Sequence, residues 1–122
     1  MNPLKPLVNP HYTIRQSLII AQGVDMRVID QTLAPGEYVP WHLHPDSDDY
    51  IICIRGELEV RELNPERVST LRPLERHLVQ KKQPHTTVNA SGEECQFLIV
   101  QGPGHLEFRA LPKVESRTDM PR

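Results

Sequence analysis

The sequence predicts an all-β protein in which short strands form a sandwich or a closed barrel. Twelve prolines and six glycines divide the 122-residue chain into segments that are too short for long helices. Runs rich in β-branched and aromatic residues lie between short turn sequences, a pattern that is typical of sandwiches and barrels. A chain of this length is expected to fold as one domain.

Turn residues separate the runs that we expect to form strands. The expected strands are residues 13–20, 24–33, 49–55, 57–63, 67–71, 86–89, 94–101 and 106–110. Glycine or proline lies between neighbouring runs, as in Gln22-Gly23 and Asn64-Pro65, where the chain must reverse. We find no internal repeat and no second domain in this pattern.

Both ends of the chain differ in composition from the middle. Residues 1–10 hold three prolines and residues 112–122 hold two, among polar side chains. We therefore expect an extended N-terminal arm over residues 1–12 and a flexible C-terminal tail over residues 112–122. The barrel domain is expected to span residues 13–111.

Charge and composition limit the classes of partner. The net charge of -2 and the isoelectric point of about 6.3 provide no basic surface for nucleic acid or an anionic membrane, so we expect a small-molecule substrate. No secretory leader and no apolar stretch long enough to span a bilayer is present, which predicts a cytoplasmic protein. Cys53 and Cys95 lack CxxC spacing and are expected to be buried thiols.

The histidines carry the strongest functional signal. If residues 41–45 are extended, the period of two places His42 and His44 on the same face, from which both imidazoles can reach one metal ion. Asp49 follows shortly afterwards, and His85 lies further along the chain. The alternative is that His42 and His44 are ordinary polar residues at the mouth of a barrel.

The chemistry of these side chains limits the metal. Structural zinc sites are usually closed and cysteine-rich, whereas three histidines leave coordination positions for water or substrate, which favours a catalytic site. Imidazoles suit zinc, copper, iron and nickel, and an added carboxylate admits iron or manganese redox chemistry. We therefore expect one divalent transition metal, iron, manganese, zinc or nickel, without a choice among them.

The spacing of these residues is similar to the first signature motif of the cupin superfamily. That motif has the form G-x5-H-x-H-x4-(carboxylate)-x6-G, and the matching residues are Gly36, His42, His44, Asp49 and Gly56. The second cupin motif is matched in part, by His85 and Asn89. The resemblance implies a double-stranded β-helix, or jelly-roll barrel, in which the three histidines and the carboxylate hold a divalent metal.

Two departures from the cupin pattern bear on function. Asp49 stands where the family usually has glutamate, and it is one methylene shorter, with roughly 1 Å less reach. We therefore expect Asp49 to act either as a fourth ligand or as a base that orients a ligand imidazole or moves a proton. The family's glycines are also absent before His85, which predicts an altered turn there.

Strand parity assigns the neighbouring side chains to faces. Trp41 and Leu43 alternate with the histidines and are expected on the opposite face. If Asp49 points inward, Cys53 does too, as a small buried group rather than a further ligand. Tyr38 shares parity with His42 in a regular strand and is therefore a candidate substrate contact.

Taken with the resemblance, these observations favour a metal-dependent enzyme. We expect a dioxygenase-type oxidation of an oxygen-rich small molecule, with Asp49 as the catalytic residue that moves a proton. The alternatives are a metal-dependent isomerase or lyase that acts on a sugar or keto acid, and a non-catalytic ligand-binding or sensory protein. By analogy with other jelly rolls we expect a homodimer, with the N-terminal arm lying across a neighbour.

Overall fold

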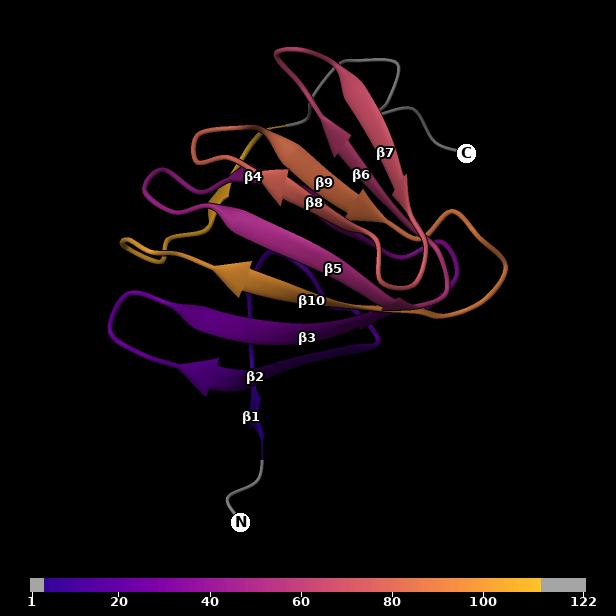
Figure 1. The fold of residues 1–122 in the computed structure, drawn as a ribbon, viewed down its shortest axis with the longest axis horizontal. Coiled ribbons are helices and arrows are strands. Elements are labelled where there is room, and N and C mark those ends of the chain that lie inside the picture. The colour runs from indigo at the N-terminus through magenta and orange to yellow at the C-terminus, as the bar shows by residue number, and fades with distance from the viewer. Residues whose placement is uncertain (1–3, 113–122) are drawn as a thin grey trace.

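The computed structural model describes residues 4–112, and these form two antiparallel sheets that face each other (Figure 1). The six-stranded sheet has the order β1 (Lys5–Pro6), β2 (Gln16–Gln22), β3 (Arg27–Leu33), β10 (Cys95–Gln101), β5 (Asp49–Arg55), β8 (Arg76–Val79). The five-stranded sheet has the order β11 (Arg109–Ala110), β4 (Tyr38–Leu43), β9 (His85–Val88), β6 (Leu58–Glu62), β7 (Arg67–Leu71). The described residues include no helix, so the predicted all-β double-stranded β-helix is confirmed.

The structure also contains strands that the sequence analysis missed. β1 lies in the predicted arm, and β8 lies in the segment before His85, where we expected only an altered turn. β8 pairs with β5 through Asp49 and Val79 at one end and Ile52 and Arg76 at the other. The two apolar residues of this edge strand, Leu78 and Val79, are adjacent and do not alternate with polar ones, so hydrophobic alternation gave no signal for it.

The core lies between the two sheets and is filled by alternate residues of the strands. Ile51 on β5, Val60 on β6 and Phe97 on β10 are almost fully buried, and β10 alternates strictly between buried and half-buried positions. Cys53 and Cys95 are both buried and unbridged, as predicted. Burial raises the pKa of Cys95 to about 11, so this thiol is uncharged at neutral pH.

A register shift in β4 changes the expected facing of its side chains. The pairing of β4 with β9 shifts between Val39 and His42, so the two-residue period does not run through the whole strand. Val39 therefore lines the same cavity as His42, whereas Tyr38 is 56% exposed. The prediction that Tyr38 contacts substrate is wrong, because the bulge points its side chain to solvent.

Turn glycines hold the loops next to the histidine motif. Gly56 has a φ of 80°, and a Cβ added there would lie 2.5 Å from the carbonyl oxygen of Glu94. Only glycine fits this close approach, which explains the second glycine of the motif.

The described part of the predicted N-terminal arm lies against its own chain. β1 pairs with β2, and the Leu7 amide donates a hydrogen bond to the carbonyl oxygen of Ser17. The predicted C-terminal tail lies outside the described residues from position 113 onward. Within residues 4–112, the structure forms no helix with the length and apolarity needed to cross a membrane.

Candidate metal centre

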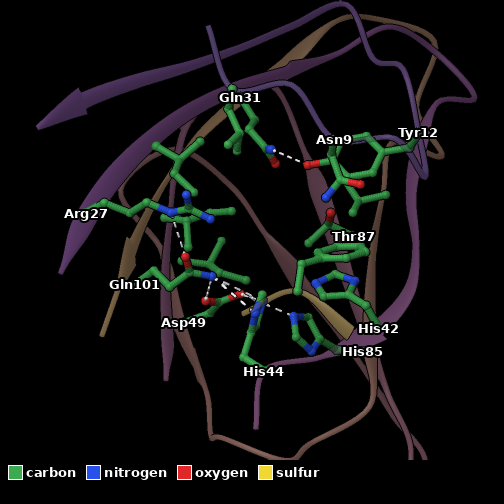
Figure 2. A pocket seen from close by; sticks show the side chains of 16 residues that line it. Asn9, Tyr12, Arg27, Gln31, His42, His44, Asp49, His85, Thr87 and Gln101 are labelled. Carbon is green, nitrogen blue, oxygen red and sulfur yellow. Dashed lines mark hydrogen bonds and ion pairs between the residues drawn. The ribbon is translucent and has the colours of Figure 1, made fainter. Parts of the chain in front are cut away.

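Four predicted site residues meet in the space between the sheets, and we call them the histidine cluster: His42, His44, Asp49 and His85. One ligand atom from each lies within 4.8 Å of the corresponding atoms of the other three. β4 and β9 supply His42 and His85 from one sheet, β5 supplies Asp49 from the other, and His44 follows the end of β4. All four side chains are buried, and Figure 2 shows them together at one end of a cavity.

Backbone carbonyls orient the three imidazoles in the same way. The Nδ1 atom of His42 donates to the carbonyl oxygen of Pro40 at 2.6 Å, and that of His85 donates to Gln83 at 2.9 Å. The Nδ1 atom of His44 donates to Glu107 at 2.7 Å. A carbonyl oxygen can only accept, so each Nδ1 carries a hydrogen and each Nε2 is left to bind a metal when the ring is neutral.

Asp49 reaches the histidines despite its shorter side chain. Its Oδ2 atom lies 3.0 Å from Nε2 of His44 and 3.3 Å from Nε2 of His85. Its Oδ1 atom accepts a hydrogen bond of 3.1 Å from Nε2 of Gln101. Although burial opposes the charged form, hydrogen bonds from Nε2 of His44 and of His85 hold the pKa of Asp49 far below its usual range. The carboxylate is therefore ionised at neutral pH. Because Nδ1 of each ring already donates to a backbone carbonyl, Nε2 donates to Asp49 only when the ring is protonated on both nitrogens.

The histidines differ in their protonation behaviour. Burial, with the neighbouring His85 and His44, lowers the pKa of His42 well below its ordinary value, so this ring is neutral. Burial also acts to lower the pKa of His44, but the hydrogen bond and charge of Asp49 outweigh it and raise that pKa. A proton on His44 therefore competes with a metal ion for Nε2.

The cavity beside the cluster is small, and both apolar and polar side chains line it. Its volume is about 30 Å³. Apolar side chains come from β3, β4, β5 and β10: Ile29, Val39, Ile51 and Ile99. The polar lining residues beyond the cluster are Asn9, Tyr12, Arg27, Gln31, Thr87 and Gln101. Figure 2 places Gln31, Tyr12 and Asn9 at the end opposite the cluster, with Arg27 and Gln101 along one side.

The residues that close this cavity were not predicted from the sequence. Leu7, Asn9 and Tyr12 come from the N-terminal segment, and Phe108 comes from the segment before β11. The Phe108 ring stacks on His42 with a centroid separation of 4.2 Å. Tyr12 precedes the first expected strand. Phe108 lies within the expected strand 106–110, but the observed strand β11 begins only at Arg109, so strand parity placed neither ring.

Two residues discussed above, Cys53 and Trp41, and two further histidines lie outside the cavity lining. Cys53 is buried among core side chains and does not line the cavity, as expected for a small buried group. Trp41 is buried away from the lining, on the face opposite His42 as predicted. His77 contacts Glu62 elsewhere in the barrel, and His11 stacks against Phe108 outside the lining.

The donor set fits a divalent transition metal ion. Three imidazole nitrogens and one carboxylate oxygen are buried together, and each group makes a further hydrogen bond that orients it. Such outer hydrogen bonds accompany most metal-binding histidines and fix the tautomer that binds. Zinc, iron, manganese and nickel all accept donors of this kind.

Comparison with known proteins supports the fold. A protein from Klebsiella pneumoniae with a double-stranded β-helix domain is similar over 86% of this chain and 91% of its own, with a TM-score of 0.71 and 25% identity. A cupin-superfamily sugar phosphate isomerase from Silicibacter pomeroyi has a TM-score of 0.66 and 19% identity, covering 80% of this chain and 70% of that one. An oxalate oxidase has a TM-score of 0.66 and 18% identity, covering 71% of this chain and 46% of that one.

The sequence itself matches a family. No curated protein matches the chain. The family of the cupin domain matches residues 29–101, a range that begins in β3, ends with β10 and includes the whole histidine cluster. This match covers more than half of the chain and agrees with the two facing sheets. The chain therefore belongs to the cupin family.

Proposed function

We propose that this protein is a metalloenzyme that holds one divalent transition metal ion in the histidine cluster and oxidises a small, oxygen-rich substrate in a dioxygenase-type reaction. The observation that carries the proposal is the convergence of three imidazole rings and one carboxylate, all oriented by further hydrogen bonds. A bound ion supplies a Lewis acid and, if it is iron or manganese, a redox centre.

Asp49 is the residue to which we assign proton transfer. Gln101 fixes one carboxylate oxygen, and the other faces His44 and His85. Asp49 is unprotonated at neutral pH, which is the form that a proton acceptor requires. Its low pKa makes it a weak base, so the proton would have to come from a substrate or water oxygen that a bound metal ion would make strongly acidic. The buried, partly apolar cavity limits the water that reaches this carboxylate.

The metal content of the protein tests the first half of the proposal. Protein purified without added metal is analysed for its elements, alongside the variants His42→Ala, His44→Ala and His85→Ala. We expect close to one transition metal ion per chain in the wild type and its loss in each variant. His77→Ala is the matched control, because His77 also contacts a buried carboxylate but lies outside the cluster. A wild type that cannot be loaded with iron, manganese, zinc or nickel contradicts the proposal.

Exchange of the metal tests the second part of the proposal, that the protein oxidises its substrate. Iron-, manganese- and zinc-loaded protein is incubated with small oxygen-rich acids and alcohols while oxygen uptake is followed. Oxygen uptake with iron or manganese but not with zinc supports oxidation. The similar solved structures include an oxalate oxidase and a sugar phosphate isomerase. Turnover with zinc and without oxygen uptake would replace our proposal with the isomerase or lyase alternative, and binding without turnover would favour a sensory protein.

We also propose that the chain forms a homodimer, and the outer face of the six-stranded sheet supports this. Val28, Tyr50, Leu78 and Val100 lie side by side on that face through their strand pairings. Leu78 is 43% exposed and Tyr50 is 37% exposed, although both are large apolar residues. The described part of the N-terminal segment pairs within its own chain, so we assign the contact to this face. Leu78→Glu is expected to give a monomer by light scattering, and an unchanged mass would contradict this assignment.

A further inference from the structure

Arg27 lines the same cavity as the histidine cluster and has no carboxylate within ion-pair distance among residues 4–112. Its side chain is half-buried at the start of β3. The Nε atom donates a hydrogen bond of 2.8 Å to Oε1 of Gln101, while no described residue accepts a hydrogen bond from Nη1 or Nη2. In Figure 2 the guanidinium lies above Gln101 at the side of the cavity. A cation that is partly removed from water is stabilised by an anionic partner.

The charges of the cavity favour an anion. Apart from the histidines, Arg27 and Asp49 are the ionisable lining residues that carry charge at neutral pH, and their charges cancel. A divalent cation in the cluster therefore leaves the cavity with an excess of positive charge. Apolar walls that include Ile29, Ile51 and Ile99 strengthen this attraction, since they reduce screening by water.

Gln31 provides a second observation that points to a ligand. Its side chain lies in the cavity wall and is 2% exposed. The Nε2 atom donates to the hydroxyl oxygens of Tyr12 at 3.1 Å and Ser17 at 3.0 Å. The Oε1 atom has no hydrogen-bond partner among the described residues. A buried acceptor without a donor costs free energy, and a ligand hydroxyl can supply that donor.

The size of the cavity limits the ligand to a small molecule. A volume of about 30 Å³ exceeds the roughly 10–15 Å³ that one water molecule needs, but only by a factor of about two to three. A ligand of a few non-hydrogen atoms therefore fits this space without rearrangement.

We propose that this cavity binds a small hydroxy carboxylate, whose carboxylate is held by the free Nη1 and Nη2 donors of Arg27 and whose hydroxyl donates to Oε1 of Gln31. A guanidinium can bind a carboxylate through two parallel hydrogen bonds, which selects the planar anion over a neutral group of the same shape. Arg27 is then the residue that determines charge specificity. The inference rests on the proposed function, since it names the substrate class of the same site.

Binding of glycolate, the smallest hydroxy carboxylate, tests the role of Arg27. Isothermal titration calorimetry compares glycolate with glycolamide, its neutral analogue, on manganese-loaded wild type and on Arg27→Gln. We expect the wild type to prefer glycolate, and Arg27→Gln to lose roughly ten- to a hundredfold in glycolate affinity with little change for glycolamide. Arg76→Gln is the matched control, because it removes one positive charge from the exposed strand β8 outside the cavity.

The result that overturns the role of Arg27 is a glycolate preference that survives in Arg27→Gln, or equal binding of glycolate and glycolamide by the wild type. The metal content of every sample is measured alongside, and the titrations are repeated on metal-free protein. Failure to bind metal therefore counts against the proposed function. Loss of charge selectivity in Arg27→Gln is measured as the ratio of the glycolate affinity to the glycolamide affinity, in both metal-loaded and metal-free protein.

A comparison of glycolate with acetate tests the role of Gln31. Acetate lacks the hydroxyl that is assigned to Gln31, so we expect the wild type to bind glycolate more tightly than acetate. The informative quantity is the change of the ratio of these two affinities in Gln31→Met, which removes the Oε1 acceptor with little change in volume. We expect the ratio to fall about fivefold or more. An unchanged ratio overturns the assignment of the hydroxyl to Gln31.

Discussion

Within residues 4–112, a histidine contacts a buried carboxylate at two places, and these places differ in geometry and in exposure. In the histidine cluster, Asp49 lies 3.0 Å and 3.3 Å from two imidazoles. At the other place, Glu62 on β6 lies only 2.7 Å from Nε2 of His77 on β8. Both carboxylates are almost fully buried, but the side chain of His77 is 18% exposed, against 5% or less for the two imidazoles around Asp49.

The difference shows that a short contact is not what makes a metal site. Glu62 has one imidazole partner, and its other cationic neighbour, Arg67, lies 3.9 Å away and is exposed. This pair joins the two sheets, because β6 and β8 belong to different ones. Asp49 instead shares its space with three rings whose Nδ1 atoms are all committed to backbone carbonyls. Convergence of oriented donors distinguishes the cluster from an ordinary hydrogen-bonded pair.

We expect the largest difference in metal affinity between variants in which one or the other of the two carboxylates is removed. Asp49→Ala should lower the affinity for manganese by more than about a hundredfold, since loss of an outer hydrogen-bond partner alone costs about 10- to 100-fold. Competition with a fluorescent chelator measures the affinity. Glu62→Ala serves as the control and should bind manganese as the wild type does. Equal affinities in the two variants would mean that Asp49 does not contribute to metal binding.

Gln101 tests whether the orientation of Asp49 matters as well as its presence. Gln101→Leu removes the hydrogen bond to Oδ1 of Asp49 but leaves every proposed ligand in place. We expect the manganese affinity to fall by about 10- to 100-fold, less than in Asp49→Ala. If the same chelator competition shows no loss, the hydrogen bond does not position the carboxylate.

The pH dependence of metal binding separates His44 from His77. Because the pKa of His44 is raised above 6.5, we expect manganese affinity to fall by about tenfold per pH unit below that raised value, as one proton displaces the ion. The stability of the metal-free protein depends on pH in the opposite direction from its metal affinity. The stabilisation from the protonated His44 is fully present below about pH 6.5 and is lost as the pH rises through the raised pKa.

Chelator competition and thermal unfolding at pH 6, 7 and 8 measure the two trends. Asp49→Asn should reduce the pH dependence of metal affinity and of thermal stability, because it removes the partner that raises the pKa of His44. His77→Ala should leave the pH dependence of metal binding unchanged. A pH profile that depends on His77 would show that the two places are coupled.

Glu62→Gln is expected to have the smallest effect on metal binding and a clear effect on stability. The substitution weakens a buried contact between the two sheets, and we expect the free energy of unfolding to fall by about 1–3 kcal/mol. Urea unfolding of metal-free protein measures this change. A loss of metal affinity in this variant would remove the distinction between the two places.

Local sequence predicted much of the central barrel and the members of the cluster. The alternation of His42 with Trp41 and of Asp49 with Tyr50 indicated which side chains point inward, because a strand places successive residues on opposite faces. The same rule failed at Tyr38, where the register of β4 shifts. It also missed β8, whose two apolar residues are adjacent and do not alternate with polar ones.

The other end of the cavity could not be predicted in this way. Arg27, Gln31 and Tyr12 lie on β3 and in the N-terminal segment, and no motif connects them with the histidines. They approach the cluster only because β3 pairs with β10, which in turn pairs with β5, the strand of Asp49. Pairing between distant strands is a property of the sheet, and no local pattern encodes it.

The sequence alone determined the strand character of the central segments and the shared face of His42 and His44, because side-chain period is a local property. The resemblance to the cupin motifs added Asp49 and His85 to the predicted site. Only the tertiary structure decided that Asp49 reaches His44 and His85, that Arg27 faces the same cavity, and that the N-terminal segment and Phe108 close it. These are distances between residues far apart in the chain, and they are set by the packing of one sheet against the other.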